Sequence, residues 1–224
     1  MIKKPVLSSL IIYFLSAIIF ILPAKAQPFI GEIAAFKKQD SVKMPPKNAI
    51  LFVGSSSFRM WTNVQEDFPM YSIINRGFGG SSLTDVIRFA DQVIFPYQPA
   101  QVVIYCGEND LASSDTVSAQ IVFDRFQQLF SLIRKQMPET PIAFVSIKPS
   151  PSREHLLQKV ITANELIKTF LKKQTKTAYI DVFSAMIDEQ GKPKPELFID
   201  DRLHMNKKGY AIWLQVIEPH LIKK

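Results

Sequence analysis

The sequence predicts an α/β fold, a three-layer α/β/α sandwich in which helices cover both faces of a parallel sheet. Five short apolar runs, rich in β-branched and aromatic residues, are typical of strands that are buried on both faces. They lie at residues 49–53, 72–75, 101–106, 142–147 and 178–183. Segments with helical character separate them, and this alternation favours strands that all run in one direction.

Amphipathic periodicity identifies three of the helices. Residues 117–137 place apolar side chains near one face, and Pro138 ends the segment. Residues 152–173 repeat the pattern. Residues 206–221 form the last predicted helix, and the side chain of Asn206 is suited to accept hydrogen bonds from its first free backbone N–H groups.

The N-terminus has the pattern of a cleaved signal peptide. The basic pair Lys3-Lys4 precedes an apolar run over residues 10–22, and Ala24-Lys25-Ala26 offers small residues for cleavage after Ala26. The run is shorter than the roughly 20 apolar residues of a membrane-spanning helix, although an uncleaved anchor is the alternative. We therefore expect residues 1–26 to be removed from an exported protein, periplasmic or secreted, without a stable membrane anchor.

The rest of the chain is predicted to be an N-terminal extension over residues 27–47, with a short helix at 30–43, followed by one domain over residues 48–224. The formal net charge is +7, but the lysines form scattered pairs, which argues against nucleic-acid binding. Cys106 is the only cysteine, so the fold contains no internal disulfide. No Cys/His grouping has the spacing of a zinc site.

Residues suited to catalysis cluster where predicted strands end and near the C-terminus. Ser56 follows the first strand in Gly54-Ser55-Ser56, and Asp201 precedes His204 by three residues. A carboxylate can orient an imidazole, and a histidine held in this way can take the proton of a serine hydroxyl and so activate it. Asp200 is an alternative orienting carboxylate, and a helix cap is the simpler interpretation of the serines.

Two further segments supply hydrogen-bond donors. Gly80 ends a glycine-rich segment after the second strand, and Asn109 follows the third strand in Gly107-Glu108-Asn109-Asp110. Ligands of parallel sheets lie outside the carboxyl ends of the strands, so we expect both segments near Ser56. The backbone N–H groups of Ser56 and Gly80 and the amide of Asn109 are candidates for an oxyanion hole. Each segment alone is also ordinary loop chemistry.

Together, the four segments resemble, in their order, the four sequence blocks of the SGNH (GDSL-type) hydrolase family. The resemblance covers about residues 48–221 and implies a flavodoxin-like sheet of five parallel strands, with no metal and no organic cofactor. It implies that Ser56 is the nucleophile, that Asp201 and His204 complete the triad, and that Gly80 and Asn109 donate to the oxyanion. The family usually has aspartate where this chain has Ser55, which leaves the triad intact but makes Ser55 a competing hydroxyl.

Membership of this family implies hydrolysis of carboxylic esters but does not name the ester. The loops are short, so we expect an open cleft for a small acyl group on a bulky, water-soluble carrier, either a small molecule or a glycan. Phe58, Trp61 and Phe78 are candidates for an aromatic wall that faces a sugar, and Arg59 for a contact with an acidic substrate. The alternative for the three aromatic residues is ordinary packing within the fold. The alternative for Arg59 is an exposed position on the surface without a role in binding.

The resulting hypothesis is an exported carbohydrate O-acetylesterase. Two alternatives remain: a lysophospholipase or thioesterase of the same family, and a non-catalytic carbohydrate-binding protein on the same scaffold.

Overall fold

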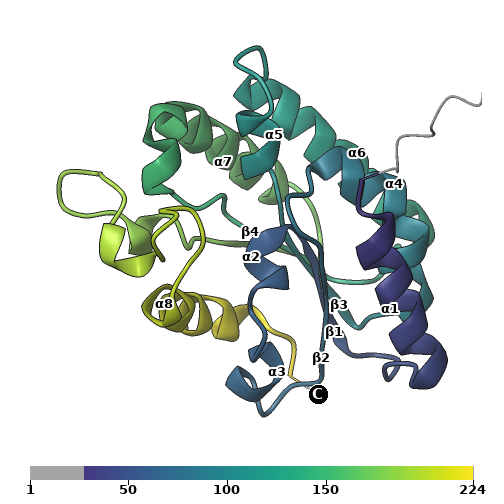
Figure 1. The fold of residues 1–224 in the computed structure, drawn as a ribbon. Coiled ribbons are helices and arrows are strands. Elements are labelled where there is room, and N and C mark those ends of the chain that lie inside the picture. Colours follow the sequence, from purple (N-terminus) through teal and green to yellow (C-terminus); the bar gives the residue numbers. More distant parts are fainter. Residues whose placement is uncertain (1–27, 224) are drawn as a thin grey trace, which may run out of the picture.

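A five-stranded sheet forms the centre of the computed structural model, which describes residues 28–223. All neighbouring strands are parallel, and their order is β2-β1-β3-β4-β5. Helices lie on both sides of the sheet (Figure 1). The predicted three-layer α/β/α fold with five parallel strands is therefore confirmed. The predicted signal peptide, residues 1–26, lies outside the described residues.

The elements alternate along the chain as predicted. The strands are β1 (Ile50–Gly54), β2 (Ile73–Gly77), β3 (Gln101–Tyr105), β4 (Ile142–Val145) and β5 (Thr177–Ile180). The α-helices are α1 (Ile30–Val42), α2 (Ser56–Arg59), α3 (Val64–Asp67), α4 (Leu83–Val93), α5 (Glu108–Ala112), α6 (Ala119–Gln136), α7 (Leu157–Leu171) and α8 (Lys207–Ile217). Short 3₁₀ helices are η1 (Phe95–Tyr97), η2 (Pro151–Leu156), η3 (Ser184–Met186), η4 (Pro195–Leu197) and η5 (Glu218–His220).

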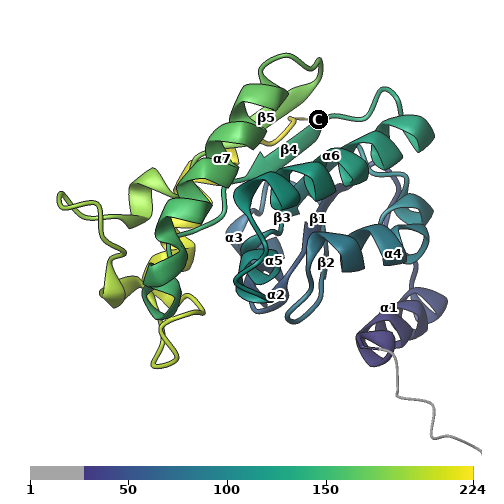
Figure 2. The same cartoon turned by 90° about the horizontal axis from the view of Figure 1, so that it is seen from above.

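The strands contribute side chains to two hydrophobic cores, because successive residues of a strand point to opposite faces of the sheet. On one face, Leu51 and Val102 pack in a core with α1, α4, α6 and α7. On the other face, Phe52 and Val103 pack in a core with α2, α3 and α8. Figure 1 shows α1, α4 and α6 on one side of the sheet and α2, α3 and α8 on the other, and Figure 2 shows α6 and α4 along the first of these faces from above. Burial on both faces explains why the strands are continuous apolar runs.

The helix predicted at residues 152–173 is broken near its start. Pro151–Leu156 form a 3₁₀ helix, and only Leu157–Leu171 are α-helical. Arg153 has φ −122° and ψ 26°, outside the helical region. This kink follows the carboxyl end of β4 and changes the direction in which the Arg153 side chain leaves the backbone.

Helix α4 is not among the three helices that we predicted from periodicity, although the sequence at its start has a capping pattern. The Ser82 backbone N–H donates to Asp85 Oδ2 at 2.9 Å, and Ser82 Oγ accepts from the Asp85 backbone N–H at 3.4 Å. This reciprocal pair is a capping box. It fixes the start of α4 directly after the Gly79-Gly80 turn.

The N-terminal helix α1 is fastened to the domain by its carboxylates. Asp40 accepts hydrogen bonds from the buried Arg76 and, at 2.6 Å, from the Tyr97 hydroxyl. Glu32 accepts from the Gly79 backbone N–H at 3.1 Å. The extension thus contacts the turn after β2. Among residues 28–223, no helix has both the length and the apolar character needed to cross a membrane.

Gly54, at the end of β1, is where we expect a single methyl group to disrupt the fold. Its φ of +138° is disfavoured for other residues, and an added Cβ would lie 1.9 Å from the Tyr105 carbonyl oxygen. Because that atom is backbone, Gly54→Ala should destabilise the protein by about 1–3 kcal/mol or more, measured by thermal and urea unfolding. Gly31→Ala is the control, since its added Cβ meets no atom within 4 Å. Equal melting temperatures for the two variants would contradict the close approach.

Candidate active site

Ser56, His204 and Asp201 are joined by hydrogen bonds. His204 Nε2 lies 3.0 Å from Ser56 Oγ, and His204 Nδ1 lies 2.5 Å from Asp201 Oδ2. Ser56 is the first residue of α2 and is separated from the end of β1 by Ser55 alone, whereas the other two residues lie in the loop before α8. The structure therefore brings the three predicted triad residues together. In this arrangement an imidazole can take the serine proton while the carboxylate stabilises the positive charge that results.

A tight turn holds Asp201 against the imidazole. Arg202 adopts a left-handed conformation with φ +56°, and Asp201 Oδ1 accepts the backbone N–H groups of Leu203 and His204, each at 2.9 Å. Burial acts to raise the pKa of Asp201, but the hydrogen bonds from the His204 ring and from these two N–H groups lower it to about 2. Asp201, and not the alternative Asp200, is thus the carboxylate that orients His204.

Helices α2 and α8, which border the serine and the histidine, are packed against each other. The Tyr210 hydroxyl of α8 donates to the Ser57 carbonyl oxygen of α2 at 2.9 Å. The rings of Phe58 and Trp213 meet edge to face, with their centres 5.9 Å apart. Asn206 caps α8 as predicted, because its Oδ1 accepts the Lys208 and Gly209 N–H groups. These contacts fix the distance between the two chain segments that carry the triad.

The candidate oxyanion donors meet around Ser81. Asn109 Nδ2 donates to the Ser81 carbonyl oxygen at 3.0 Å, and Ser81 Oγ donates to the Gly54 carbonyl oxygen at 3.1 Å. Gly80 is exposed with φ +77°, and within the described part of the chain its N–H has no acceptor. Ser56 is the first residue of a helix, so its N–H has no intrahelical acceptor either. Hydrogen bonds of Ser81 thus bring the segments that carry Ser56, Gly80 and Asn109 next to one another.

Asp110 fixes the position of the Gly80 turn from the side of α5. Its Oδ2 accepts the Leu83 N–H at the start of α4 at 2.9 Å, and its Oδ1 accepts Arg125 Nη1 at 2.8 Å. Burial raises the pKa of Asp110, and the bonds from Leu83 and Arg125 oppose this shift. The sequence predicted no role for Asp110 or Ser81. Both residues position other residues of the site through hydrogen bonds between segments that are distant in the sequence.

Comparison with known protein families agrees with this geometry. The model of the GDSL-like lipase/acylhydrolase family matches residues 52–212. The chain belongs to this family. It is therefore a carboxylic ester hydrolase, and the predicted resemblance is confirmed. No curated protein sequence matches the chain.

Solved structures of GDSL-like hydrolases and esterases share the fold. A GDSL-like lipase from Bacteroides thetaiotaomicron is 21% identical, with a TM-score of 0.71, covering 84% of this chain and 96% of that one. An acetyl xylan esterase is 20% identical, with a TM-score of 0.63 and coverages of 77% and 99%. A family 3 carbohydrate esterase from Clostridium thermocellum is 16% identical, with a TM-score of 0.59 and coverages of 76% and 95%. At these identities the similarity concerns the fold.

A buried cluster of charged groups lies beside the site of this GDSL-like hydrolase. Glu108 accepts hydrogen bonds from Lys148 Nζ at 2.7 Å, from the Ser150 hydroxyl at 2.6 Å and from the Tyr105 hydroxyl at 2.8 Å. Arg153 Nη1 lies 3.5 Å from Glu108 Oε1. Burial acts to raise the pKa of Glu108, but the charges of Lys148 and Arg153 lower it below its usual value. Glu108 is therefore an ionised carboxylate between two cations.

Two of the residues predicted to contact substrate are not available to it. Phe58 and Phe78 are fully buried, each in one of the two hydrophobic cores, so they cannot form an aromatic wall against a sugar. The interpretation was wrong because nearness in sequence does not determine which way a side chain points. Arg59 is exposed on the surface, which agrees with the alternative to substrate binding, and its Nε lies 3.4 Å from Glu32 Oε1. Ser55 is buried, and the imidazole contacts Ser56 instead.

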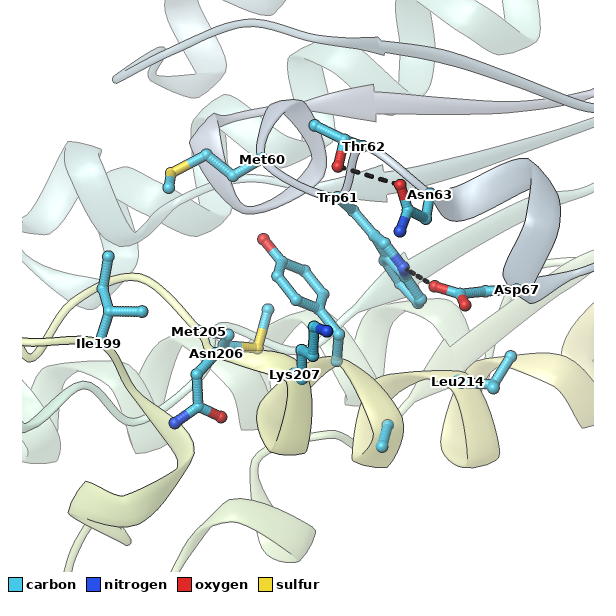
Figure 3. A pocket seen from close by; sticks show the side chains of 12 residues that line it. Met60, Trp61, Thr62, Asn63, Asp67, Ile199, Met205, Asn206, Lys207 and Leu214 are labelled. Carbon is cyan, nitrogen blue, oxygen red and sulfur yellow. Dashed lines mark hydrogen bonds between the residues drawn. The ribbon is translucent and has the colours of Figure 1, made fainter.

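A pocket lies between α2, α3 and α8, next to the triad but not over it. Its volume is about 640 Å³. Met60 and Trp61 reach it from the α2 side, whereas Met205 and Leu214 reach it from α8 and the loop before it (Figure 3). Trp61, the third predicted aromatic residue, is only 2% exposed, and its indole N–H donates to Asp67 Oδ2 at 2.5 Å. Its ring therefore forms part of the pocket wall but offers little surface for stacking.

No metal site is seen among the residues that the structure describes. Within 28–223, no group of three or more His, Cys, Asp or Glu side chains is arranged to hold an ion.

Replacing Asp201 by asparagine should lower the activity at every pH at which the wild-type protein is active. Because the Asp201 pKa is about 2, its negative charge is present from mildly acidic to alkaline solution and is lost only as the pH falls towards that value. Asp201→Asn should lower kcat by about 10²–10⁴-fold across this range, measured as a pH profile of ester hydrolysis. Asp200→Asn, the control, should keep wild-type turnover. Similar losses in both variants would contradict the assignment of Asp201.

Proposed function

We propose that the chain is an exported serine esterase that removes acetyl groups from carbohydrates through a Ser56-His204-Asp201 triad. The observation that carries the proposal is the chain of hydrogen bonds from Ser56 through His204 to Asp201, next to the unpaired N–H of Gly80 and the amide of Asn109. This combination supplies a nucleophile, its base and donors for an oxyanion.

The geometry supports a two-step reaction. In the first step, Ser56 Oγ attacks the ester carbonyl carbon while His204 Nε2 takes the hydroxyl proton. The N–H groups of Ser56 and Gly80 and the amide of Asn109 donate to the oxygen that becomes negative. His204 then gives the proton to the leaving alcohol, and an acyl-Ser56 ester remains. In the second step, water attacks this ester while His204 Nε2 takes one of its protons. His204 then gives that proton to Ser56 Oγ as the acyl–Oγ bond breaks, which releases the carboxylic acid and restores Ser56.

Acetylated carbohydrate is the substrate class that several features favour. Gly80 is exposed and an added Cβ there would meet no atom within 4 Å, so no side chain covers this edge of the site. Two proteins of the same fold are an acetyl xylan esterase and a carbohydrate esterase. Export rests on the signal-peptide pattern of residues 1–26. An exported enzyme meets glycan-borne esters, which agrees with this substrate.

The pocket between α2 and α8 favours a second candidate, a lysophospholipase or thioesterase. Its lining includes Met60, Ile199, Met205 and Leu214, and Ile199 is 41% exposed. A flexible, apolar lining of this kind suits a long acyl chain better than an acetyl group. The two candidates therefore differ in the acyl chain length that the enzyme prefers.

A parallel substrate screen separates these candidates. Acetylated xylo-oligosaccharides, lysophospholipids and acyl thioesters are given to purified protein, and the released acid is measured. We expect release of acetate from the sugars with the highest kcat/KM. Cleavage of long-chain substrates without any acetate release from sugars would overturn the carbohydrate proposal in favour of the second candidate.

Ser56→Ala tests the chemistry apart from the substrate. With p-nitrophenyl acetate, this variant should lose roughly 10³-fold or more of its turnover, because the nucleophile is gone. Ser55→Ala is the matched control, since the Ser55 side chain makes no capping bond to α2, and it should keep its activity. Activity that survives in Ser56→Ala but disappears in Ser55→Ala would assign the nucleophile to Ser55.

A further inference from the structure

Both ends of the Asn109 amide have partners that select one orientation. Its Nδ2 donates to the Ser81 carbonyl oxygen at 3.0 Å, and its Oδ1 accepts from Arg153 Nη2 at 3.0 Å. A carbonyl oxygen only accepts and a guanidinium only donates. A rotation of the amide by half a turn would place oxygen against oxygen and nitrogen against guanidinium. One amide hydrogen is used on Ser81, so the second remains for a substrate oxyanion.

Arg153 is itself held by the buried cluster beneath the site. Its Nη1 lies 3.5 Å from Glu108 Oε1, and the Arg153 side chain is 19% exposed. Glu108 is fixed by Lys148 and by the hydroxyl groups of Ser150 and Tyr105. Glu108 is also the residue directly before Asn109 in α5. The same carboxylate thus anchors the guanidinium and the helix that carries the amide.

The position of Arg153 depends on the irregular start of the segment after β4. Arg153 departs from helical geometry within η2, and the neighbouring Ser152 N–H donates to the Arg202 carbonyl oxygen at 3.0 Å. That oxygen belongs to the turn between Asp201 and His204. The kinked segment therefore contacts the amide through Arg153 and the turn of the triad through Ser152.

We propose that Arg153 is a positioning residue for the oxyanion hole, which holds the Asn109 amide with its free hydrogen towards the reacting oxygen. The inference rests on the proposed function and deepens it. Arg153 also polarises the amide, because donation to Oδ1 strengthens the N–H groups as donors.

Kinetics of Arg153→Gln and Arg153→Lys with p-nitrophenyl acetate test the proposal. Arg153→Gln should lower kcat by about 10- to 100-fold, since a donor displaced by about 1 Å loses a large part of its effect, with KM changed by less than about twofold. Arg153→Lys keeps a donor for Asn109 Oδ1 and should recover part of the loss. A rise in KM with unchanged kcat would overturn the proposal and make Arg153 a substrate-binding residue.

A double-mutant cycle with Asn109→Ala gives the decisive readout. If Arg153 acts through the amide, Arg153→Gln should cost little in the Asn109→Ala background, where there is no amide to orient. Independent losses that multiply would overturn the proposal. Arg134→Gln is the control, because Arg134 bonds backbone carbonyl oxygens at residues 138, 140, 175 and 176, away from the site. It should lower the melting temperature and leave kcat unchanged.

Failure of the inference can be told from failure of the proposed function. The proposed chemistry fails if wild-type protein and Ser56→Ala hydrolyse p-nitrophenyl acetate at the same slow rate. The inference alone fails if Ser56→Ala is inactive while Arg153→Gln keeps its kcat.

Discussion

The packing of α8 against α2 is the constraint on which the triad depends. Ser56 and His204 are 148 positions apart in the chain, yet their side chains are 3.0 Å apart. The Tyr210–Ser57 hydrogen bond and the contact between Phe58 and Trp213 hold the two helices together. The core beneath β1 and β3 thus supports catalysis directly, because a small shift of either helix would separate the hydroxyl from the imidazole.

The oxyanion side of the site is organised by different contacts. Ser81 connects the Gly80 turn to the end of β1 and to Asn109, and Asp110 connects the start of α4 to α5. The buried carboxylate of Glu108 forms ion pairs with both Lys148 and Arg153. A buried ion cluster of this kind costs desolvation energy and is weak evidence for stability. Its place next to Asn109 instead agrees with a role in orienting a donor group.

Several features of the fold could be predicted from local patterns. The apolar runs located all five strands, and Asn206 marked the start of α8. Helix α4 was not identified by its periodicity, although its Ser82/Asp85 capping box was present in the sequence. The break at Arg153 was not predicted, because it lies among the polar residues 152–155, before the apolar pattern begins at Leu156, so periodicity carries no information about it. The contact that fixes Arg153 is made by Glu108, which belongs to another part of the chain.

The alternation of apolar strands and helical segments was enough to predict the α/β fold, because local periodicity distinguishes the two kinds of element. The geometry of parallel strands places the strand ends together. The hydrolase family and its site residues were indicated by the resemblance of four short polar segments, taken in order, to the sequence blocks of that family. Only the tertiary structure decided that Phe58 and Phe78 are buried and that Arg153 contacts Asn109. Side-chain direction and contacts between distant segments depend on packing, and no single stretch of sequence contains that information.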